Sequence, residues 1–477
     1  MGAEITEAEI AAFHDVVGRL RALPVDDPVR LRAEQVAASF ARDGRLRRRR
    51  ARGAQVSAAD AAAMAATATG ALDRREDAPL TDDVRHGTDA VGSAESTVRR
   101  APGTEPVASP GAGALRTVGV YRRPRTCYVC KLPYRQVDAF YHRLCPACAA
   151  DNSARRALST DLSGRRVLLT GGRVKIGFQL ALMMLRDGAE VAVTSRFPHD
   201  TVRRFHAEPG SAAWRDRLTV LAVDLRDPRQ VLGLCEDLRR DGAPLDILVN
   251  NAAQTVRRPP SSYALLAAGE RDALPEGARR APGFTPMRML EGLGGSLSAL
   301  PAALREADEA GLLPDPSPEN SWSARLGELD PAEVLETQLV NSLAPALLCD
   351  RLLPLLLASP RPRRYVINVT AVEGRFAVRN KTAGHPHTNM AKAALNMLTR
   401  TSAAELAEQG VHMCAVDTGW ITDENPAPKK ARMANAGFRT PLDIVDGAAR
   451  VYDPVVRGEA GDPVSGVFLK DYREAQW

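Results

Sequence analysis

Four of the seven cysteines lie in two closely spaced pairs. Cys127 and Cys130 form one CxxC pair, Cys145 and Cys148 form the second, and fourteen residues separate the pairs. Each CxxC turn presents two thiolates, and four thiolates suit a tetrahedral Zn²⁺ at about the spacing of small zinc ribbons and knuckles. Because four ligands leave no open position for a substrate, the pattern predicts a structural zinc site, with an iron–sulfur centre as the lesser alternative.

The segment that holds these cysteines is basic and aromatic. Residues 121–160 contain eight basic and two acidic residues, so this segment carries the whole formal net charge of +6. Two interpretations remain open. We favour aromatic residues that cover the metal and a charge that docks the module onto an acidic face of the same protein; the alternative is a nucleic-acid site. The aromatic residues are Tyr121, Tyr128, Tyr134, Phe140 and Tyr141.

A glycine-rich turn forms the second chemical region. Residues 170–177 read TGGRVKIG, follow a short apolar run and precede a helical pattern. Glycines let the backbone approach a phosphate, and the free N–H groups at a helix N-terminus attract it. In this context the turn predicts a phosphate-binding loop for a nucleotide.

Alternating strands and helices must position this loop. Short apolar runs recur, with helical stretches between them, at 166–170, 190–194, 218–223, 246–250, 364–369 and 411–416. This rhythm predicts a Rossmann-like α/β fold with a doubly wound parallel sheet over residues 161–477. In such a sheet the ligand crevice lies at the carboxyl ends of the strands.

The order of the motifs in this domain resembles that of the short-chain dehydrogenase/reductase superfamily. The turn is similar to the family's TGxxxGxG loop, Asn250-Asn251-Ala252-Ala253 to its NNAG motif, and Lys392 in AKAALNM to its active-site lysine. The resemblance covers roughly residues 161–250 and 333–425 and implies a nicotinamide-dependent oxidoreductase. It implies catalytic roles for Asn341 and Lys392. It also implies cofactor contacts for Gly171, Gly172, Ile176, Gly177, Asp224, Asn250, Ala252, Thr422 and Lys392.

Two departures from the family concern the cofactor. Lys175 stands where the family has its middle loop glycine, and we expect its ammonium group to pair with the pyrophosphate. After the second strand, where NAD-preferring members carry an acid, this chain has Ser195 and Arg196. A hydroxyl and a guanidinium suit a 2′-phosphate, so the sequence predicts NADP(H) rather than NAD(H).

The larger departure is catalytic. The family sets a tyrosine four residues before its lysine, but this chain has Thr388 there, and Thr370 with Ala371 stands near the family's serine. An aliphatic hydroxyl is far less acidic than a phenol, so Thr388 cannot replace the tyrosine as proton donor. His385 and His387 are the candidate acids, because histidine titrates near neutral pH; the alternative is that both cap a loop.

An insertion separates the two halves of the resemblance. Nearly ninety residues lie between the NNAA motif and Asn341, where the family has a couple of dozen, which places the insertion at about 255–332. It leaves the sheet beside the expected nicotinamide, where long insertions shape substrate pockets, and its stretch 281–318 is expected to form a mobile lid. Three residues at its start indicate a possible anionic small-molecule substrate, with a solvated arginine pair as the alternative: Arg257, Arg258 and Tyr263.

The chain is predicted to have four parts: a helical region (1–52), a flexible linker (53–118), the zinc module (119–160) and the NADP-binding domain (161–477). The linker is rich in small residues and has no aromatic side chain, so it cannot form a core. The whole chain has 477 residues, which is too long for one ordinary domain.

Two helices are expected in the N-terminal region. Thr6 and Glu9 match a capping box, and a second helix is expected from Asp27-Pro28 to Gly44. Two short helices bury little surface, so we expect them to pack on the rest of the chain or on a second subunit. The run Arg47–Arg50 is interpreted as a solvated helix end, because nearby acids cancel its charge.

Several broader expectations follow. No run of eighteen apolar residues exists, so no membrane span is expected, and the absence of a signal-peptide pattern with reduced cysteines indicates a cytoplasmic protein. By family analogy the protein is expected to be a homo-oligomer.

Three functions remain open. The first is an NADP-dependent oxidoreductase with an atypical acid, the second a non-redox dehydratase, isomerase or lyase on the same fold, and the third a binding protein in which the nucleotide gates the zinc module.

Overall fold

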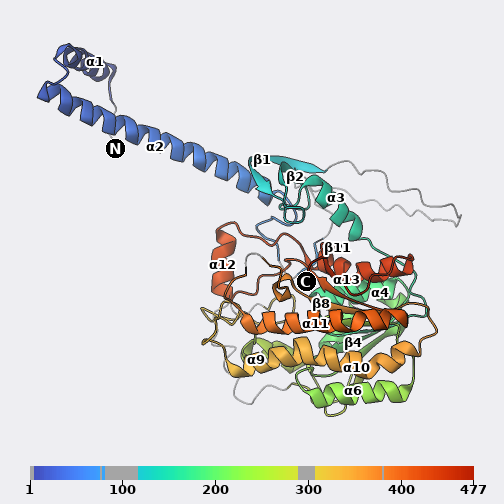
Figure 1. Ribbon diagram of the computed structural model, residues 1–477. Helices are drawn as coiled ribbons and strands as arrows, with labels where there is room; N and C mark the ends of the chain where they lie inside the picture. Colours follow the sequence, from blue (N-terminus) through green and yellow to red (C-terminus); the bar gives the residue numbers. More distant parts are fainter. Residues whose placement is uncertain (1–4, 76–77, 81–115, 288–306, 379–380) are drawn as a thin grey trace, which may run out of the picture.

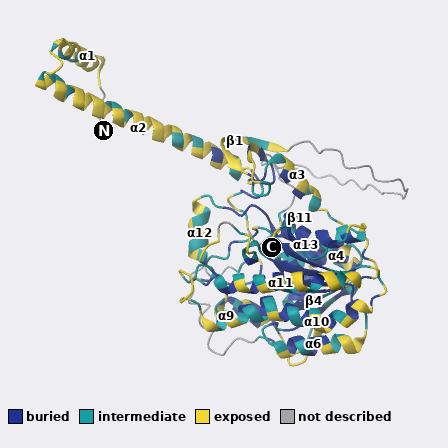
Figure 2. Ribbon diagram, viewed as in Figure 1, coloured by how far each residue is buried: buried dark blue, intermediate teal, exposed yellow. Residues whose placement is uncertain are grey.

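The computed structural model describes residues 5–75, 78–80, 116–287, 307–378 and 381–477. Three parts follow one another along the chain: a helical arm, a small module that holds the paired cysteines, and a large α/β domain (Figure 1). Buried residues gather in the α/β domain, whereas the arm is exposed along almost its whole length (Figure 2). The α/β domain therefore contains the core that positions the candidate site.

The α/β domain is built on a nine-stranded sheet. Its order is β11-β10-β9-β8-β6-β3-β4-β5-β7, and every neighbouring pair is parallel except β10 with β11. The predicted doubly wound, Rossmann-like fold is confirmed. The six predicted runs form the central strands β3 (Arg166–Leu169), β4 (Glu190–Ser195), β5 (Leu218–Ala222), β6 (Ile247–Asn250), β8 (Arg364–Thr370) and β9 (Val411–Asp417).

Three short strands at the two ends of the sheet have no counterpart among the predicted runs. They are β7 (Ala278–Arg280) at one edge, β11 (Arg473–Ala475) at the other edge, and β10 (Phe468–Lys470), which pairs with both β9 and β11. β7 belongs to the insertion and pairs with β5, with Val220 opposite Ala278. Its three residues include two exposed arginines and show no apolar alternation, so periodicity could not reveal it. The insertion is therefore joined to the sheet itself.

Helices cover both faces of the sheet because its central strands are apolar on both sides. In β3, Val167 and Leu169 lie in one core and Leu168 lies in the other. The first core includes α4 (Lys175–Arg186), α5 (Pro198–His206) and α13 (Ile444–Glu459). The second includes α6 (Pro228–Asp241), α10 (Ala344–Leu357) and α11 (Pro386–Glu408).

One continuous helix runs from α9 (Pro331–Gln338) through a π-turn (Leu339–Leu343) into α10. Within the described ranges it alone is long and apolar enough, by length and composition, to cross a membrane. It packs against α6, α11 and the sheet, and 44% of its most apolar window is buried. We therefore interpret it as a flanking helix of the α/β core.

The cysteine module consists of the antiparallel hairpin β1 (Thr117–Thr126) and β2 (Pro133–Asp138), followed by α3 (Pro146–Arg155). It lies against the α/β domain (Figure 1). Four of its five aromatic rings are buried in one hydrophobic cluster that also contains Ile421, Leu442 and Ile444 of the α/β domain. These four rings are therefore used for packing and are not free to stack on bases.

The helical arm is longer than predicted. α1 (Glu7–Ala22) begins with the predicted capping box, and α2 begins after Asp27 as predicted. However, α2 continues to Ala65 instead of ending at Gly44, so it crosses the predicted boundary into the linker. Above its base, α2 packs on no described residue of the other two parts, and the arm exposes large apolar side chains that include Phe13, Val36 and Phe40. Packing of the arm on a second subunit stays a prediction.

Candidate active site and cysteine cluster

The predicted site residues gather at the carboxyl ends of the central strands. Thr170 follows β3, Ser195 ends β4, Asn250 ends β6 and Thr370 ends β8. These strands are parallel neighbours in the sheet, so their carboxyl ends lie along one edge. This edge is where a doubly wound sheet binds its ligands.

The glycine turn is closed by contacts that only glycine allows. Gly171 has φ +71, and a Cβ on it would lie 2.9 Å from the Cα of Ala252. A Cβ on Gly177 would lie 2.1 Å from the Gly171 carbonyl oxygen. The Thr170 hydroxyl accepts hydrogen bonds from the N–H groups of Asn251 and Ala252, both at 3.0 Å. The turn and the NNAA motif are therefore fixed against each other.

Lys175 takes the place of a glycine in backbone conformation as well as in sequence. Its φ is +55, in the left-handed region, at the first residue of α4. Its Nζ lies 3.7 Å from Oε1 of Glu424, which follows β9. Burial alone would raise the pKa of Glu424, but the charges of Lys175, Lys430 and Arg258, with a hydrogen bond from Thr422, lower it to about 2. Lys175 and Glu424 thus form a charged contact across the turn.

The two residues at the end of β4 have different environments. Ser195 is buried, and its hydroxyl oxygen accepts hydrogen bonds from the Phe197 N–H at 3.0 Å and the Thr201 hydroxyl at 2.8 Å. The guanidinium of Arg196 lies 5.3 Å from the ring centre of Tyr263 and 5.6 Å from that of Phe197. Among the described residues Arg196 forms no ion pair. Arg196 is therefore the group at this strand end that can meet an anion.

Asp224 is held beside the next strand end. Its carboxylate accepts hydrogen bonds from Arg226, the shortest at 2.6 Å, and its N–H donates to Gln230 at 2.9 Å. Burial would raise the pKa of Asp224, but the bonds and charge of Arg226 lower it. The carboxylate is therefore charged, and Arg226 fixes its orientation.

Asn341 lies inside the π-turn and braces the start of the insertion. Its side-chain oxygen accepts from the Gln254 N–H at 2.7 Å, and its amide donates to the Gln254 carbonyl at 2.9 Å. π-turns inside α-helices are frequent at functional sites. The extra residue of the turn directs the Asn341 amide toward the backbone that follows β6.

Asparagine side chains also link β6 to β8. The Asn250 amide donates to Asn368 at 2.8 Å, and the Asn368 amide donates to Thr399 of α11 at 2.9 Å. The Asn250 side-chain oxygen is buried and, within the described part of the chain, has no hydrogen-bond partner. A buried acceptor without a partner costs about 1–3 kcal/mol, which indicates that a water or ligand atom supplies one.

Lys392 is buried beneath the crevice without a counter-ion. Its Nζ donates to the Val369 carbonyl at 2.9 Å, and the described residues offer it no carboxylate. Burial lowers the pKa of Lys392 to about 8. Thr388, one turn earlier on the same helix face, is also buried, and its hydroxyl has no protein partner among the described atoms. Thr370 contacts the Lys392 carbonyl only weakly, at 3.5 Å.

The two candidate histidines are placed differently. His385 caps α11 with φ +40, stacks on Trp322 at 4.1 Å between ring centres, and bonds through Nδ1 to the Trp322 carbonyl at 2.8 Å. His387 is buried with neither ring nitrogen bonded to a described residue. It lies five residues before Lys392, about 140° around the helix. Burial lowers the pKa of His387, and the charge of Glu333 on α9 opposes this.

Described residues of the insertion contact the candidate site at three points. The Ala310 carbonyl accepts from Arg173 of the glycine turn at 2.7 Å, Asn320 donates to the Glu424 carbonyl at 2.8 Å, and Trp322 holds His385. Of the predicted anion-binding arginines, Arg257 pairs with Asp330 and Glu336 at 3.3 and 3.4 Å. The predicted lid lies partly outside the described residues, at 288–306.

Three residues of the site lie outside every predicted motif. They are Gln254, Trp322 and Glu424. Gln254 directly follows the NNAA motif and Glu424 lies two residues after Thr422, so proximity in sequence was their only signal. No sequence motif lies near Trp322, and its only signal was that the chain has just four tryptophans.

The four paired cysteines form a cluster. Their Sγ atoms all lie within 4.8 Å of one another, and those of Cys130 and Cys145 are 3.7 Å apart. Zn–S bonds of about 2.3 Å at tetrahedral angles place sulfur atoms about 3.8 Å apart, so the cluster fits a Zn²⁺ ion. The Cys145 N–H also donates to the Cys127 sulfur at 3.3 Å.

The cysteine module contacts the loop that follows β9. The Tyr128 hydroxyl oxygen accepts from the Trp420 N–H at 2.9 Å. Burial raises the pKa of Tyr128 to about 12, so the phenol stays neutral. Tyr141 donates to Asp446 at 2.6 Å. The loop with Thr422 and Glu424 is therefore held between the crevice and the module.

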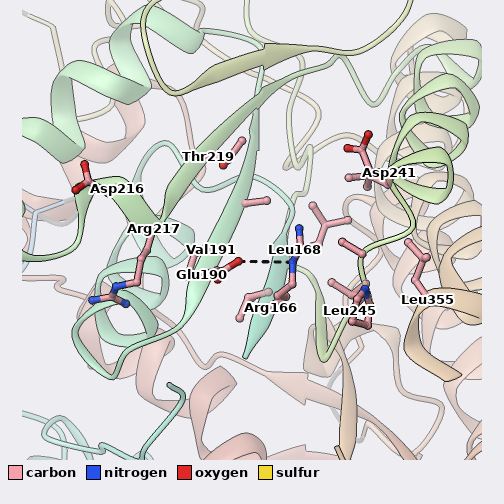
Figure 3. A pocket seen from close by; sticks show the side chains of 15 residues that line it. Arg166, Leu168, Glu190, Val191, Asp216, Arg217, Thr219, Asp241, Leu245 and Leu355 are labelled. Atoms are coloured by element: carbon pink, nitrogen blue, oxygen red, sulfur yellow. Dashed lines mark ion pairs between the residues drawn. The ribbon is translucent and has the colours of Figure 1, made fainter. Parts of the chain in front are cut away.

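A cavity of about 180 Å³ lies away from this site (Figure 3). Its lining includes Arg166 and Glu190, the first residues of β3 and β4, with Asp216, Arg217 and Asp241. It therefore lies at the amino ends of the strands, opposite the crevice, and does not belong to the candidate active site.

Comparison with known families gives two matches. The family described as "short chain dehydrogenase" matches residues 165–267, and the family described as "Enoyl-(Acyl carrier protein) reductase" matches residues 316–441. The first match contains the glycine turn and the NNAA motif, and the second contains Asn341, Lys392 and Thr422. Most of the insertion lies between them.

Three relatives illustrate the range of similarity. The uncharacterized protein R665 of Acanthamoeba polyphaga mimivirus is 32% identical over 350 residues, which cover 69% of this chain and 71% of that protein. A probable oxidoreductase of Streptomyces antibioticus is 38% identical over 97 residues, 19% of this chain and 30% of that protein. The gluconate 5-dehydrogenase of Gluconobacter oxydans is 33% identical over 103 residues, 22% of this chain and 39% of that protein.

Solved structures resemble the α/β domain at low identity. The Pseudomonas aeruginosa RhlG/NADP active-site complex has a TM-score of 0.41 and 22% identity, covering 65% of this chain and 95% of that one. The NADPH-bound carbonyl reductase from chicken fatty liver has a TM-score of 0.41 and 18% identity, covering 66% of this chain and 100% of that one.

Proposed function

The chain belongs to the short-chain dehydrogenase/reductase superfamily, and from that membership we propose that it is an NADP(H)-dependent oxidoreductase that reduces a C=O, C=C or C=N group. The observation that carries the proposal is the convergence of the glycine turn, Arg196 and Lys392 on one edge of the sheet. A substrate with a small anionic group is included in the proposal, because Arg258 is half-buried near Glu424 and, unlike Arg257, has no ion-pair partner among the described side chains.

The residues present fit NADP(H). The N–H groups at the start of α4 would hold the pyrophosphate, Arg196 the 2′-phosphate, Asp224 the adenine side and Lys392 the ribose hydroxyls. Two observations support this assignment. The half-buried guanidinium of Arg196 forms no ion pair with a described residue and can meet a phosphate, and the buried side-chain oxygen of Asn250 has no hydrogen-bond partner among the described residues. The bound cofactor would supply the hydride.

We propose Lys392 as the proton source. A lysine whose pKa is lowered by burial to about 8 is a suitable general acid near neutral pH. Its ammonium group would donate the proton that neutralises the reduced substrate, and it would be left as the neutral amine. Thr388 shares its helix face, and its free hydroxyl would orient the substrate heteroatom. His387 lies about 140° around the helix from Lys392, and His385 is stacked on Trp322, so neither is assigned this role.

Arg196→Gln tests the cofactor assignment. Loss of one charged contact to a 2′-phosphate should weaken NADPH binding roughly 10-fold or more, since hydrogen bonds to charged groups contribute about 1.5–3 kcal/mol. NADH binding should change little. Fluorescence titration with both cofactors measures this, and Arg203→Gln, on the exposed face of the next helix, is the matched control. Equal affinity of the unmodified protein for NADH and NADPH would refute the assignment.

The pH dependence of the reduction tests the proton source. Only the charged form of Lys392 can donate, so kcat should be constant below pH 8 and fall about tenfold per pH unit above it. If His387 were the acid, kcat would fall from below pH 6.5 instead, because burial lowers the pKa of His387. His387→Gln should leave the profile unchanged. A panel of carbonyl, enone and imine substrates with NADPH also separates reduction from the non-redox alternative.

We further propose that the four cysteines bind a structural Zn²⁺ ion. The donor set is four thiolates at distances that suit tetrahedral coordination, and two of the four residues are buried. The ion would hold the two CxxC turns together and leave no site for a substrate.

A further inference from the structure

An exposed part of α2 carries most of the arm's positive charge. Between residues 31 and 59 every side chain is exposed or half-buried, and Asp60 is the only buried residue of the helix (Figure 2). Residues 42–52 contain seven arginines and one acid, Asp43. Residues 161–477 hold equal numbers of basic and acidic residues, so the high arginine content of the chain does not by itself produce this excess.

The arginines of this segment are not neutralised. Arg45, Arg48, Arg49 and Arg52 follow helical spacing on one face and line one shallow hollow, and Arg47 and Arg50 lie on the opposite face. Among the described residues none of these six forms an ion pair, so the sequence-based expectation that nearby acids cancel the charge is wrong. Arginine guanidinium groups bind phosphate with two hydrogen bonds each.

The basic surface continues onto the cysteine module. The Asp60 carboxylate accepts from the backbone N–H groups of Arg122 at 2.5 Å and Arg123 at 3.3 Å, so it anchors β1 to α2 without neutralising their side chains. The Arg123 guanidinium lies beside Gly53, 3.9 Å from the position of a Cβ there. The helix and β1 therefore present one continuous basic surface, the arginine surface, made of Arg42–Arg52 and β1.

The residues of the arginine surface indicate which class of anionic partner it fits. Leu46 is the only large apolar residue between positions 42 and 52, so the segment lacks the apolar face that a membrane-surface helix needs. A lone α-helix fits the major groove of B-form DNA, which is about 12 Å wide, and arginines on opposite faces would then reach phosphates on both strands. The major groove of duplex RNA is too deep and narrow for this.

We propose that the arginine surface binds the phosphate backbone of duplex DNA, with α2 in the major groove and β1 beside it. The contacts are to phosphates, so binding is not expected to depend on base sequence. The proposal is independent of the reductase function, because it uses no residue of the crevice.

The test compares the whole protein with a variant in which Arg45, Arg48, Arg49 and Arg52 are replaced by glutamine. Fluorescence anisotropy with a labelled 24-bp duplex of random sequence is measured across salt concentrations. The unmodified protein should bind with a log–log salt slope of about −0.9 per phosphate contacted. The variant should lose roughly 100-fold in affinity at low salt, and its slope should be shallower by about 3 to 4.

The matched control removes four exposed arginines of the α/β domain and should bind DNA as the unmodified protein does. Unchanged circular dichroism and NADPH affinity verify that the arm variant is folded. The proposal fails if the unmodified protein does not bind the duplex at 50 mM salt, or if the arm variant binds the duplex as tightly as the unmodified protein. It also fails if single-stranded RNA or anionic vesicles are bound as tightly as the duplex. The control positions are Arg186, Arg229, Arg351 and Arg400.

Discussion

Lys392→Met is expected to remove nearly all reductase activity and, at the same time, to stabilise the cofactor-free protein. Loss of the proton source and of the ribose contact should lower kcat/KM about 10²- to 10⁴-fold. Burial lowers the pKa of Lys392 from 10.5 to about 8, and one pKa unit corresponds to about 1.4 kcal/mol, so the buried charge costs the folded state about 3 kcal/mol at neutral pH. Methionine fills a similar volume without that charge.

The stability gain should depend on pH with a defined sign. Between pH 8 and 10.5 the unfolded chain keeps the Lys392 proton while the folded protein loses it, so the cost of this lysine disappears as pH rises through that window. Near pH 7, after loss of the hydrogen bond to the Val369 carbonyl, Lys392→Met should raise the melting temperature by about 2–4 °C. The gain should vanish near pH 10.5.

Arg400→Met is the matched control, because Arg400 lies exposed on the same helix. It should change neither activity nor melting temperature appreciably. Full activity of Lys392→Met would remove Lys392 from the mechanism, whereas a lower melting temperature at pH 7 would mean that the ammonium group has a counter-ion in solution.

The central sheet was predictable because each of its strands is a short apolar run buried on both faces. Burial of a valine or leucine side chain contributes about 1.5–3 kcal/mol, so such runs dominate the local pattern. The strand β7 has no such pattern, since Arg279 and Arg280 are exposed and the strand exists only because β5 offers an edge. Tertiary pairing of this kind leaves no periodic trace in the sequence.

The length of α2 shows why a glycine alone does not end a helix. Gly44 costs about 1 kcal/mol in a helix interior, but it ends the helix only where a left-handed cap satisfies the last carbonyls. The arginines and alanines that follow have high helix propensity, so the helix continues to Ala65. Like-charge repulsion among them was not sufficient to break it.

The sequence predicted which edge of the sheet carries the candidate site, but not how the residues of the site contact one another. The glycine turn and Lys392 carry fixed spacings relative to strand ends, which is why they were found. The pairing of Lys175 with Glu424, the stacking of His385 on Trp322 and the bond from Asn341 to Gln254 join segments that are far apart in the chain. Such contacts depend on the tertiary arrangement of these segments, and no local pattern specifies that arrangement.

Removal of zinc is expected to unfold the cysteine module and to weaken cofactor binding in the crevice. Structural zinc contributes roughly 10–16 kcal/mol in small zinc-binding peptides, so Cys130→Ser should leave the module without its main source of stability. The module shares a hydrophobic cluster with Ile421 and Leu442, on either side of the segment that carries Thr422 and Glu424. NADPH affinity should therefore fall about 10-fold or more, and zinc analysis should show less than one ion per chain.

Tyr128→Phe separates the effect of the loop from that of the metal. It removes the oxygen that accepts the Trp420 N–H while keeping the ring and all four cysteines, so zinc should remain at one ion per chain. Since a hydrogen bond contributes about 0.5–1.5 kcal/mol, NADPH affinity should fall a few-fold. If zinc-free protein binds NADPH as tightly as the zinc-loaded protein, the module does not support the crevice. If instead Cys130→Ser lowers the NADPH affinity and Tyr128→Phe does not, the module stabilises the crevice through the shared hydrophobic cluster alone.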